Sequence, residues 1–160
     1  MAQIYLSENF IVESFETPHV TRTDWWHIRI RIIDESITDR TKISPVIAIE
    51  FMRLTMIIGE AMEIAMNNQW VNVVKINYQD MGNWAFKWGK KPFFHMHIYG
   101  RAKDAKFQIF PESVYLPDRS SGFYDKFEPL NKEDILEIQK QIGIIEKQEK
   151  YQTSKWCFKK

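Results

Sequence analysis

The sequence predicts an α+β fold, in which an antiparallel sheet of about five strands carries one main helix packed on it and a C-terminal helix. Three observations predict this class. Two strand-like runs, residues 9–15 and 26–33, come early in the chain, and a long helical stretch begins at Ser44-Pro45. A second helical pattern follows Asn131 near the end. Because helices and strands do not alternate regularly, a doubly wound parallel sheet is disfavoured.

The expected strands are short apolar runs rich in β-branched residues. Residues 9–15 (NFIVESF) and 26–33 (WHIRIRII) alternate or run apolar, which is typical of sheet strands. Residues 71–78 and 93–99 show the same pattern, and the segment 80–91 between them is rich in Gly, Asn, Trp and Lys. We expect these last two strands to pair antiparallel.

Two helices have clear start signals. Ser44 is a favourable N-cap and Pro45 suits the first helical position, so the main helix is expected to run to about Asn68. Asn131 similarly caps a helix over residues 132–147. Polar residues at helical spacing predict one solvent stripe on the main helix, opposite a broad apolar face: Glu50, Arg53, Glu60, Glu63 and Asn67.

Length and composition limit the classes of function. With 160 residues and 44% apolar content, we expect one domain over residues 1–160, of which 131–160 are a C-terminal helix and tail. The formal net charge of +1 creates no global field for nucleic acid or an anionic membrane. The single Cys157, the absence of a signal-peptide pattern and the absence of a long apolar run predict a cytoplasmic protein.

Two of the four histidines lie two residues apart in one apolar strand. His95 and His97 therefore share a face, while Phe94, Met96 and Ile98 point to the other face. A neutral imidazole can attack phosphorus while its neighbour stabilises charge. For an isolated pair, the simpler interpretation is two partly buried histidines that bond to backbone carbonyls.

A metal site is a third interpretation of the same strand. Two histidines on one strand can supply two zinc ligands, but the next ligand would come from His19, His27 or a carboxylate at no recognisable spacing. We therefore predict no metal. On the strand of His27, Arg29 and Arg31 alternate onto one face, which is either a cationic surface for phosphates or an ordinary exposed basic face.

The segment FFHMHIYGR at 93–101 resembles the signature of the histidine triad family, His-φ-His-φ-His-φ-φ followed closely by Arg. The strand that begins near His27, the helix after Ser44-Pro45 and the Asn-rich strand 72–80 resemble other parts of the family in the same order. The resemblance covers about residues 5–118. It implies a homodimer that uses no redox cofactor.

The resemblance implies a nucleotide-phosphate hydrolase or transferase. Its substrate would be a nucleoside phosphoramidate or a dinucleoside polyphosphate, and a nucleotidyl-histidine would form as the intermediate. His95 corresponds to the nucleophile and His97 to the last triad histidine, which lies near the phosphate oxygens. The implied nucleotide-binding and phosphate-binding residues are His27, Gln79, Asn77 and His19.

Several residues depart from the family pattern. Phe93 replaces the first triad histidine, so we expect looser orientation of His95 and slow turnover. Three tryptophans stand where glycine is usual, and two apolar residues occupy the first turn of the main helix. Together they predict an exposed patch that binds a protein partner on a strongly diverged or redesigned scaffold, with core packing as the simpler alternative: Trp25, Trp26, Val46, Ile47 and Trp70.

A further hypothesis is a stacking platform for single-stranded nucleic acid, built from alternating aromatic and basic residues. Near-neutral net charge disfavours it. The residues concerned are Trp84, Lys87, Trp88, Lys90 and Lys91 in one segment and Lys155, Trp156, Phe158, Lys159 and Lys160 in the other.

Overall fold

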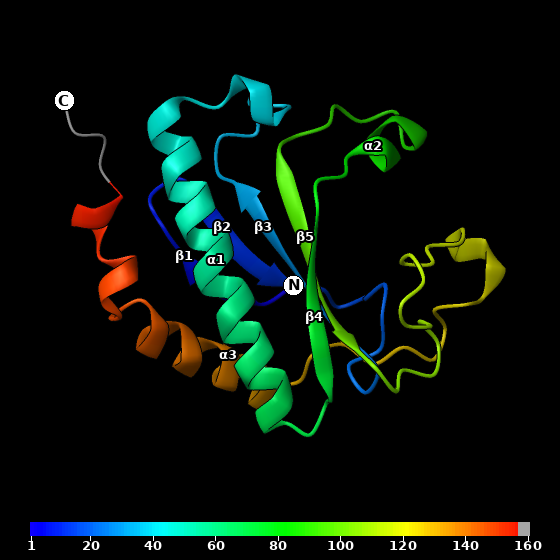
Figure 1. Ribbon diagram of the computed structural model, residues 1–160. Helices are drawn as coiled ribbons and strands as arrows, with labels where there is room; N and C mark the ends of the chain where they lie inside the picture. The colour runs from blue at the N-terminus through cyan, green and yellow to red at the C-terminus, as the bar shows by residue number, and fades with distance from the viewer. Residues whose placement is uncertain (157–160) are drawn as a thin grey trace.

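The computed structural model describes residues 1–156 and contains a five-stranded antiparallel sheet (Figure 1). Cys157 and the expected stacking residues Phe158, Lys159 and Lys160 lie outside the described residues. The strand order is β1-β2-β3-β5-β4. The strands are β1 (Gln3–Leu6), β2 (Phe10–Ser14), β3 (Trp26–Ile32), β4 (Val73–Gln79) and β5 (His95–Ala102).

Two helices lie over the same face of the sheet. Figure 1 shows α1 (Pro45–Asn68) crossing the sheet with α3 (Lys132–Ile145) beside it. The side chains of Phe94, Met96 and Ile98 are buried in the core under α1, away from the histidines, as the alternation predicted. The α+β class and the arrangement of one main helix and a C-terminal helix on the sheet are confirmed.

The start of α1 follows the sequence signals. The Ser44 side chain accepts a hydrogen bond from the Ile47 backbone N–H, and Pro45 occupies the first turn. The prediction that these polar residues form one solvent stripe is only partly correct, because some of their side chains form hydrogen bonds to other segments of the chain. Arg53 Nε donates to the Tyr151 carbonyl at 2.6 Å, and Glu60 accepts from the Tyr151 hydroxyl at 2.9 Å. The segment that follows α3 is thereby attached to α1.

The N-terminus of α3 is held by a capping box and an ion pair. The Asn131 side chain accepts from the Asp134 N–H, and the Asp134 carboxylate accepts from the Asn131 N–H. Asp134 is fully buried and also accepts two hydrogen bonds from Arg22, at 2.6 and 2.8 Å. This contact fixes α3 to the loop that enters β3.

The short elements were not predicted from the sequence. The strand β1 has only four residues, and the helix α2 (Asn83–Lys87) has only five, so neither is long enough for periodicity to show. The 3-10 turns at Arg40–Lys42, Arg119–Ser121, Glu149–Tyr151 and Thr153–Lys155 are shorter still. Within residues 1–156, no helix combines the length and the apolar character that crossing a membrane requires.

The prediction that Trp25 and Trp26 lie on an exposed partner patch is wrong, because both side chains are fully buried. The Trp25 indole N–H donates to the Ala102 carbonyl at 3.3 Å, and the Arg101 guanidinium lies 3.7 Å from the ring centroid. The Trp26 indole N–H donates to the Arg22 carbonyl at 3.0 Å. The alternative of core packing is correct for both residues.

The other three residues of that patch do not form one surface. Val46 lies at the start of α1 and Trp70 lies just beyond its end, so about 36 Å of helix separates them. Ile47 is partly buried against the core. Trp70 is 95% exposed, and its φ of 62° lies in the left-handed region that favours glycine. The backbone here keeps the conformation of a glycine position although the residue is tryptophan.

Replacing Trp70 with glycine is expected to stabilise the protein by about 1 kcal/mol, because it removes the left-handed strain of a residue with a Cβ atom. The exposed indole has little packing to lose. The measurement is the free energy of unfolding in urea.

Trp88→Gly is the matched control, since Trp88 is also exposed but has a φ of −98°. It should bring no gain. Equal stabilisation by both substitutions would show that loss of an exposed indole, rather than relief of backbone strain, is responsible.

Candidate active site

The sheet brings all four histidines together on the face opposite α1. In the antiparallel register, Arg29 of β3 lies opposite His97 of β5, and His27 lies opposite Tyr99, so these side chains share a face. The ring centroids of His95 and His97 are 4.9 Å apart, and those of His27 and His97 are 5.0 Å apart. His19, from the loop after β2, lies 5.3 Å from His27. These four residues form the histidine cluster.

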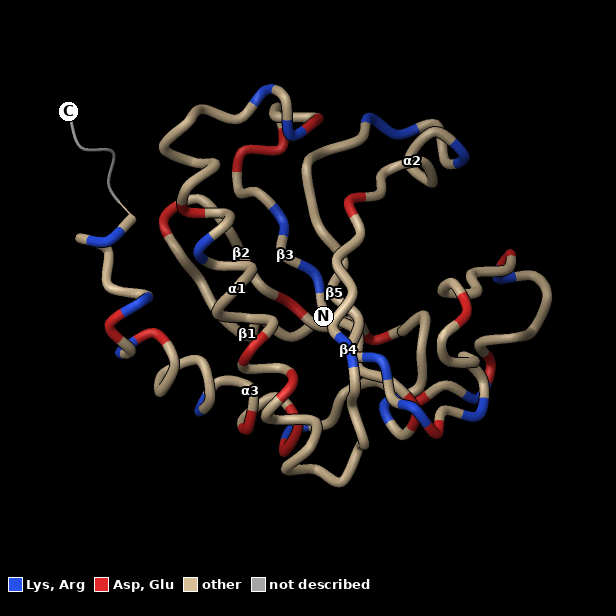
Figure 2. Tube along the Cα trace, viewed as in Figure 1, with Lys and Arg blue, Asp and Glu red and all other residues tan. Residues whose placement is uncertain are grey.

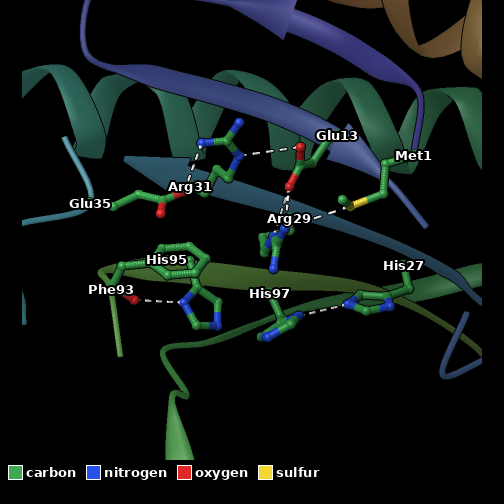
Figure 3. A network of polar contacts seen from close by, with 9 residues as sticks. All are labelled: Met1, Glu13, His27, Arg29, Arg31, Glu35, Phe93, His95 and His97. Atoms are coloured by element: carbon green, nitrogen blue, oxygen red, sulfur yellow. Dashed lines mark hydrogen bonds and ion pairs between the residues drawn. The ribbon is translucent and has the colours of Figure 1, made fainter. Parts of the chain in front are cut away.

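A backbone hydrogen bond fixes the tautomer of His95. Its Nδ1 lies 2.8 Å from the carbonyl oxygen of Phe93, as Figure 3 shows. Because a carbonyl only accepts, Nδ1 carries the proton and Nε2 keeps a lone pair. This contact uses a backbone oxygen and does not depend on the side chain at position 93, so the expectation that the loss of the first triad histidine loosens His95 stays a prediction.

His97 and His27 orient one another. His97 Nδ1 and His27 Nε2 are 2.8 Å apart, and His27 Nδ1 is buried with no hydrogen-bond partner in the described chain. A buried N–H without an acceptor costs more than a buried lone pair without a donor, so we assign His27 Nε2 as the donor. His97 then carries its proton on Nε2. The Nε2 atoms of His95 and His97 are thus complementary: His95 Nε2 offers a lone pair, and His97 Nε2 offers an N–H donor.

Burial keeps the cluster neutral. Desolvation lowers the pKa of His27 and His97 well below the usual value, and mutual repulsion among the histidines and Arg29 adds to the effect. For His19, desolvation and the charges of Arg119 and Arg29 lower the pKa to about 4. The pKa of His95 is also lowered, chiefly by desolvation, although the Phe93 hydrogen bond opposes the shift. At neutral pH, His95 is therefore an unprotonated imidazole.

A cavity of about 300 Å³ opens beside His95 and His97. It is mostly apolar, and its lining includes a few polar side chains, which is typical of small-molecule sites. The segment around α2 supplies much of the wall. The lining residues are Phe15, His19, Arg29, Met81, Gly82, Asn83, Trp84, Ala85, Trp88, Lys90, Lys91, Pro92, Phe93, His95, His97 and Leu116.

The predicted site residues fall into two groups. His95, His97 and His19 line the cavity. His27 is buried behind them, stacked on Phe15 and Tyr99 at 4.4 and 4.3 Å. Gln79, opposite His97, and Asn77, opposite Tyr99, occupy the histidine face but do not line the cavity.

The disfavoured nucleic-acid hypothesis concerned the basic and aromatic residues around α2. Four of them line this same cavity: Trp84, Trp88, Lys90 and Lys91. Figure 2 shows Lys and Arg positions near α2, and both acidic and basic positions scattered over the remaining chain. Lys87 forms an ion pair with Asp118 instead. Phe15 was missed, although it continues the alternation of β2 by one residue.

The basic residues of β3 are neither free nor fully exposed. Glu13 of β2 is 5% exposed and accepts from Arg29 Nε at 2.9 Å and from Arg31 Nε at 3.3 Å. Arg31 also pairs with the exposed Glu35 at 3.5 Å. Only Arg29 of these two arginines reaches the cavity.

The neutral cluster makes stability depend on pH. The unfolded chain binds protons at its histidines below about pH 6.5, whereas the folded protein does not until the pH approaches the lowered values, about 4 for His19. Stability is therefore lost as the pH falls through this window. Between about pH 7.5 and about pH 5.5, wild type should lose about 1 kcal/mol more than His27→Gln in urea unfolding. Parallel losses in the two proteins would contradict a neutral buried His27.

Comparison with known proteins identifies the fold. No protein-family model and no curated protein matches the chain. A histidine triad protein from Sinorhizobium meliloti 1021 is 15% identical with a TM-score of 0.62, and the match covers 89% of this chain and 87% of that one. A Hit-like protein involved in cell-cycle regulation from Bartonella henselae is 13% identical, with a TM-score of 0.55 and coverage of 87% and 85%. A histidine triad protein from Marinobacter aquaeolei VT8 is 14% identical, with a TM-score of 0.55 and coverage of 90% and 87%. The chain has the histidine triad fold.

Proposed function

We propose that the protein is a nucleotide-phosphate hydrolase or transferase in which His95 Nε2 attacks the α-phosphorus. The observation that carries this proposal is the hydrogen bond from His95 Nδ1–H to the Phe93 carbonyl, beside the cavity. It holds a neutral ring with its lone pair on the other nitrogen, which is the form a nucleophilic imidazole requires. The similar structures, which are named histidine triad or Hit-like proteins, share the fold that carries this site.

The reaction divides into two displacements at one phosphorus. In the first, the Nε2 lone pair forms a P–N bond, and the bond from phosphorus to the leaving group breaks with its electron pair on the leaving group. In the second, water attacks the same phosphorus, the P–N bond breaks, and its electron pair returns to Nε2. The leaving group and the attacking water exchange protons with solvent. His97 donates its Nε2–H to a phosphate oxygen in both steps.

The cavity fits a nucleotide in size and in lining. Phe15, Trp84 and Trp88 offer aromatic surfaces on which a base can stack, and three histidines line the same cavity. Lys90 and Lys91 line the same cavity, and neither forms an ion pair within residues 1–156. We infer a nucleoside phosphoramidate or a dinucleoside polyphosphate as the substrate class.

Incubation with adenosine 5′-phosphoramidate, followed by a rapid alkaline denaturing quench, which preserves a P–N bond, and intact-protein mass spectrometry, should detect one adenylyl group on the wild-type protein, and peptide mapping at alkaline pH should locate it on His95. His95→Asn should form no adduct and should lose turnover by on the order of 10³-fold or more. Trp70→Gly, which changes an exposed residue outside the cavity, is the control and should form the adduct normally. Adduct formation by His95→Asn would exclude His95 as the nucleophile.

A second test separates the Phe93 backbone from its side chain. Phe93→Leu keeps the carbonyl that fixes His95, so ¹⁵N NMR should show the Nδ1–H tautomer of His95 in both proteins. The loss of turnover should be far smaller than in His95→Asn. A mixed or reversed tautomer in Phe93→Leu would show that the Phe93 ring, rather than its carbonyl, orients the nucleophile.

A further inference from the structure

We propose that Arg29 is a catalytic residue of this site, which donates hydrogen bonds to the phosphoryl group that His95 attacks. This inference rests on the proposed function and names the cation that binds the reacting phosphate.

The register of the sheet places Arg29 beside the histidines. Arg29 lies opposite His97 on the neighbouring strand and lines the cavity together with His95 and His97. Arg31 lies on the same face and is directly opposite His95, but it does not line the cavity. The two arginines share a strand, a face and a carboxylate partner, and they differ in access to the site.

The Arg29 guanidinium is held in place before any ligand binds. Its side chain is 16% exposed, and its central carbon lies 5.2 Å from the Phe15 ring centroid and 5.5 Å from that of Phe93. Glu13 accepts hydrogen bonds from Nε and Nη2, as Figure 3 shows. Nη2 also lies 3.7 Å from the Met1 sulfur. Glu13 is therefore a positioning residue for Arg29.

One edge of the guanidinium keeps donors for a ligand. Nη1 has no hydrogen-bond partner within the described residues, so its two N–H groups remain available on the group that lines the cavity. A guanidinium edge matches the oxygens of a phosphoryl group. Together with the His97 Nε2–H, this edge would supply donors for phosphoryl oxygens in the cavity that His95 also lines.

The chemistry of the displacement calls for such a cation. Negative charge on the phosphoryl oxygens and the leaving group must be stabilised while the P–N bond forms, and Arg29 does this without gaining or losing a proton. Its charge also contributes to the lowered pKa of each of the four histidines, which helps to keep His95 unprotonated. One side chain thus favours both the neutral nucleophile and the anionic substrate.

The binding test uses AMP as the probe and His95→Asn as the background, so that no covalent chemistry occurs. Addition of Arg29→Met should weaken AMP binding in isothermal titration calorimetry by about tenfold to a hundredfold, the value of a charge-assisted hydrogen bond. Addition of Arg31→Met, the matched control, should leave it nearly unchanged. Both substitutions remove one partner of Glu13, so urea unfolding should show comparable losses of stability.

The kinetic test uses otherwise wild-type protein. Arg29→Met should lower kcat/KM for adenosine 5′-phosphoramidate by about 100-fold, and Arg29→Lys should recover part of the loss. Arg29→Met should also move the acidic limb of the pH profile to higher pH, because His95 loses a neighbouring positive charge.

Equal effects of Arg29→Met and Arg31→Met on AMP affinity, or no effect of either, would overturn the assignment of Arg29. If the wild-type protein forms no adduct on His95, the proposed function fails, and the AMP titrations still decide separately whether Arg29 binds phosphate.

Discussion

The pairing of β3 with β5 is the constraint on which the rest of the site depends. Side chains alternate along both strands, so this single register places His97 beside Arg29 and His27 beside Tyr99 on one face. The same register sends Met96 and Ile98 into the core under α1. A slip of one residue would exchange the two faces, and would place imidazoles in hydrocarbon and isoleucine in the cavity.

Burial then determines what the imidazoles can do. Rings held among Phe15, Tyr99 and one another lose contact with water, so the neutral form is favoured and a lone pair stays available. The hydrogen bond of His95 to the Phe93 carbonyl decides which nitrogen bears that lone pair. The site is thus prepared by backbone geometry and desolvation, and its cation is held nearby by a buried carboxylate, Glu13.

Sequence periodicity was sufficient to predict the strands and helices that bury one regular face. The alternation around His95 and the Ser44-Pro45 cap predicted the histidine face and the start of α1. Features that depend on three-dimensional contacts were not accessible. The burial of Trp25 depends on Arg101 and Ala102, which come about 75 residues later in the chain. The wall formed by α2 also follows from tertiary packing, because five residues have no detectable period.

A crystal structure of the wild-type protein with AMP tests the role of His95 most directly. We expect phosphorus about 3 to 3.5 Å from His95 Nε2 in this complex, with the base against the aromatic wall of the cavity. We also expect Arg29 Nη1 to contact a phosphate oxygen. Phosphate bound only at Lys90 and Lys91, with His95 Nε2 turned away from it, would contradict the central claim that this imidazole is the nucleophile.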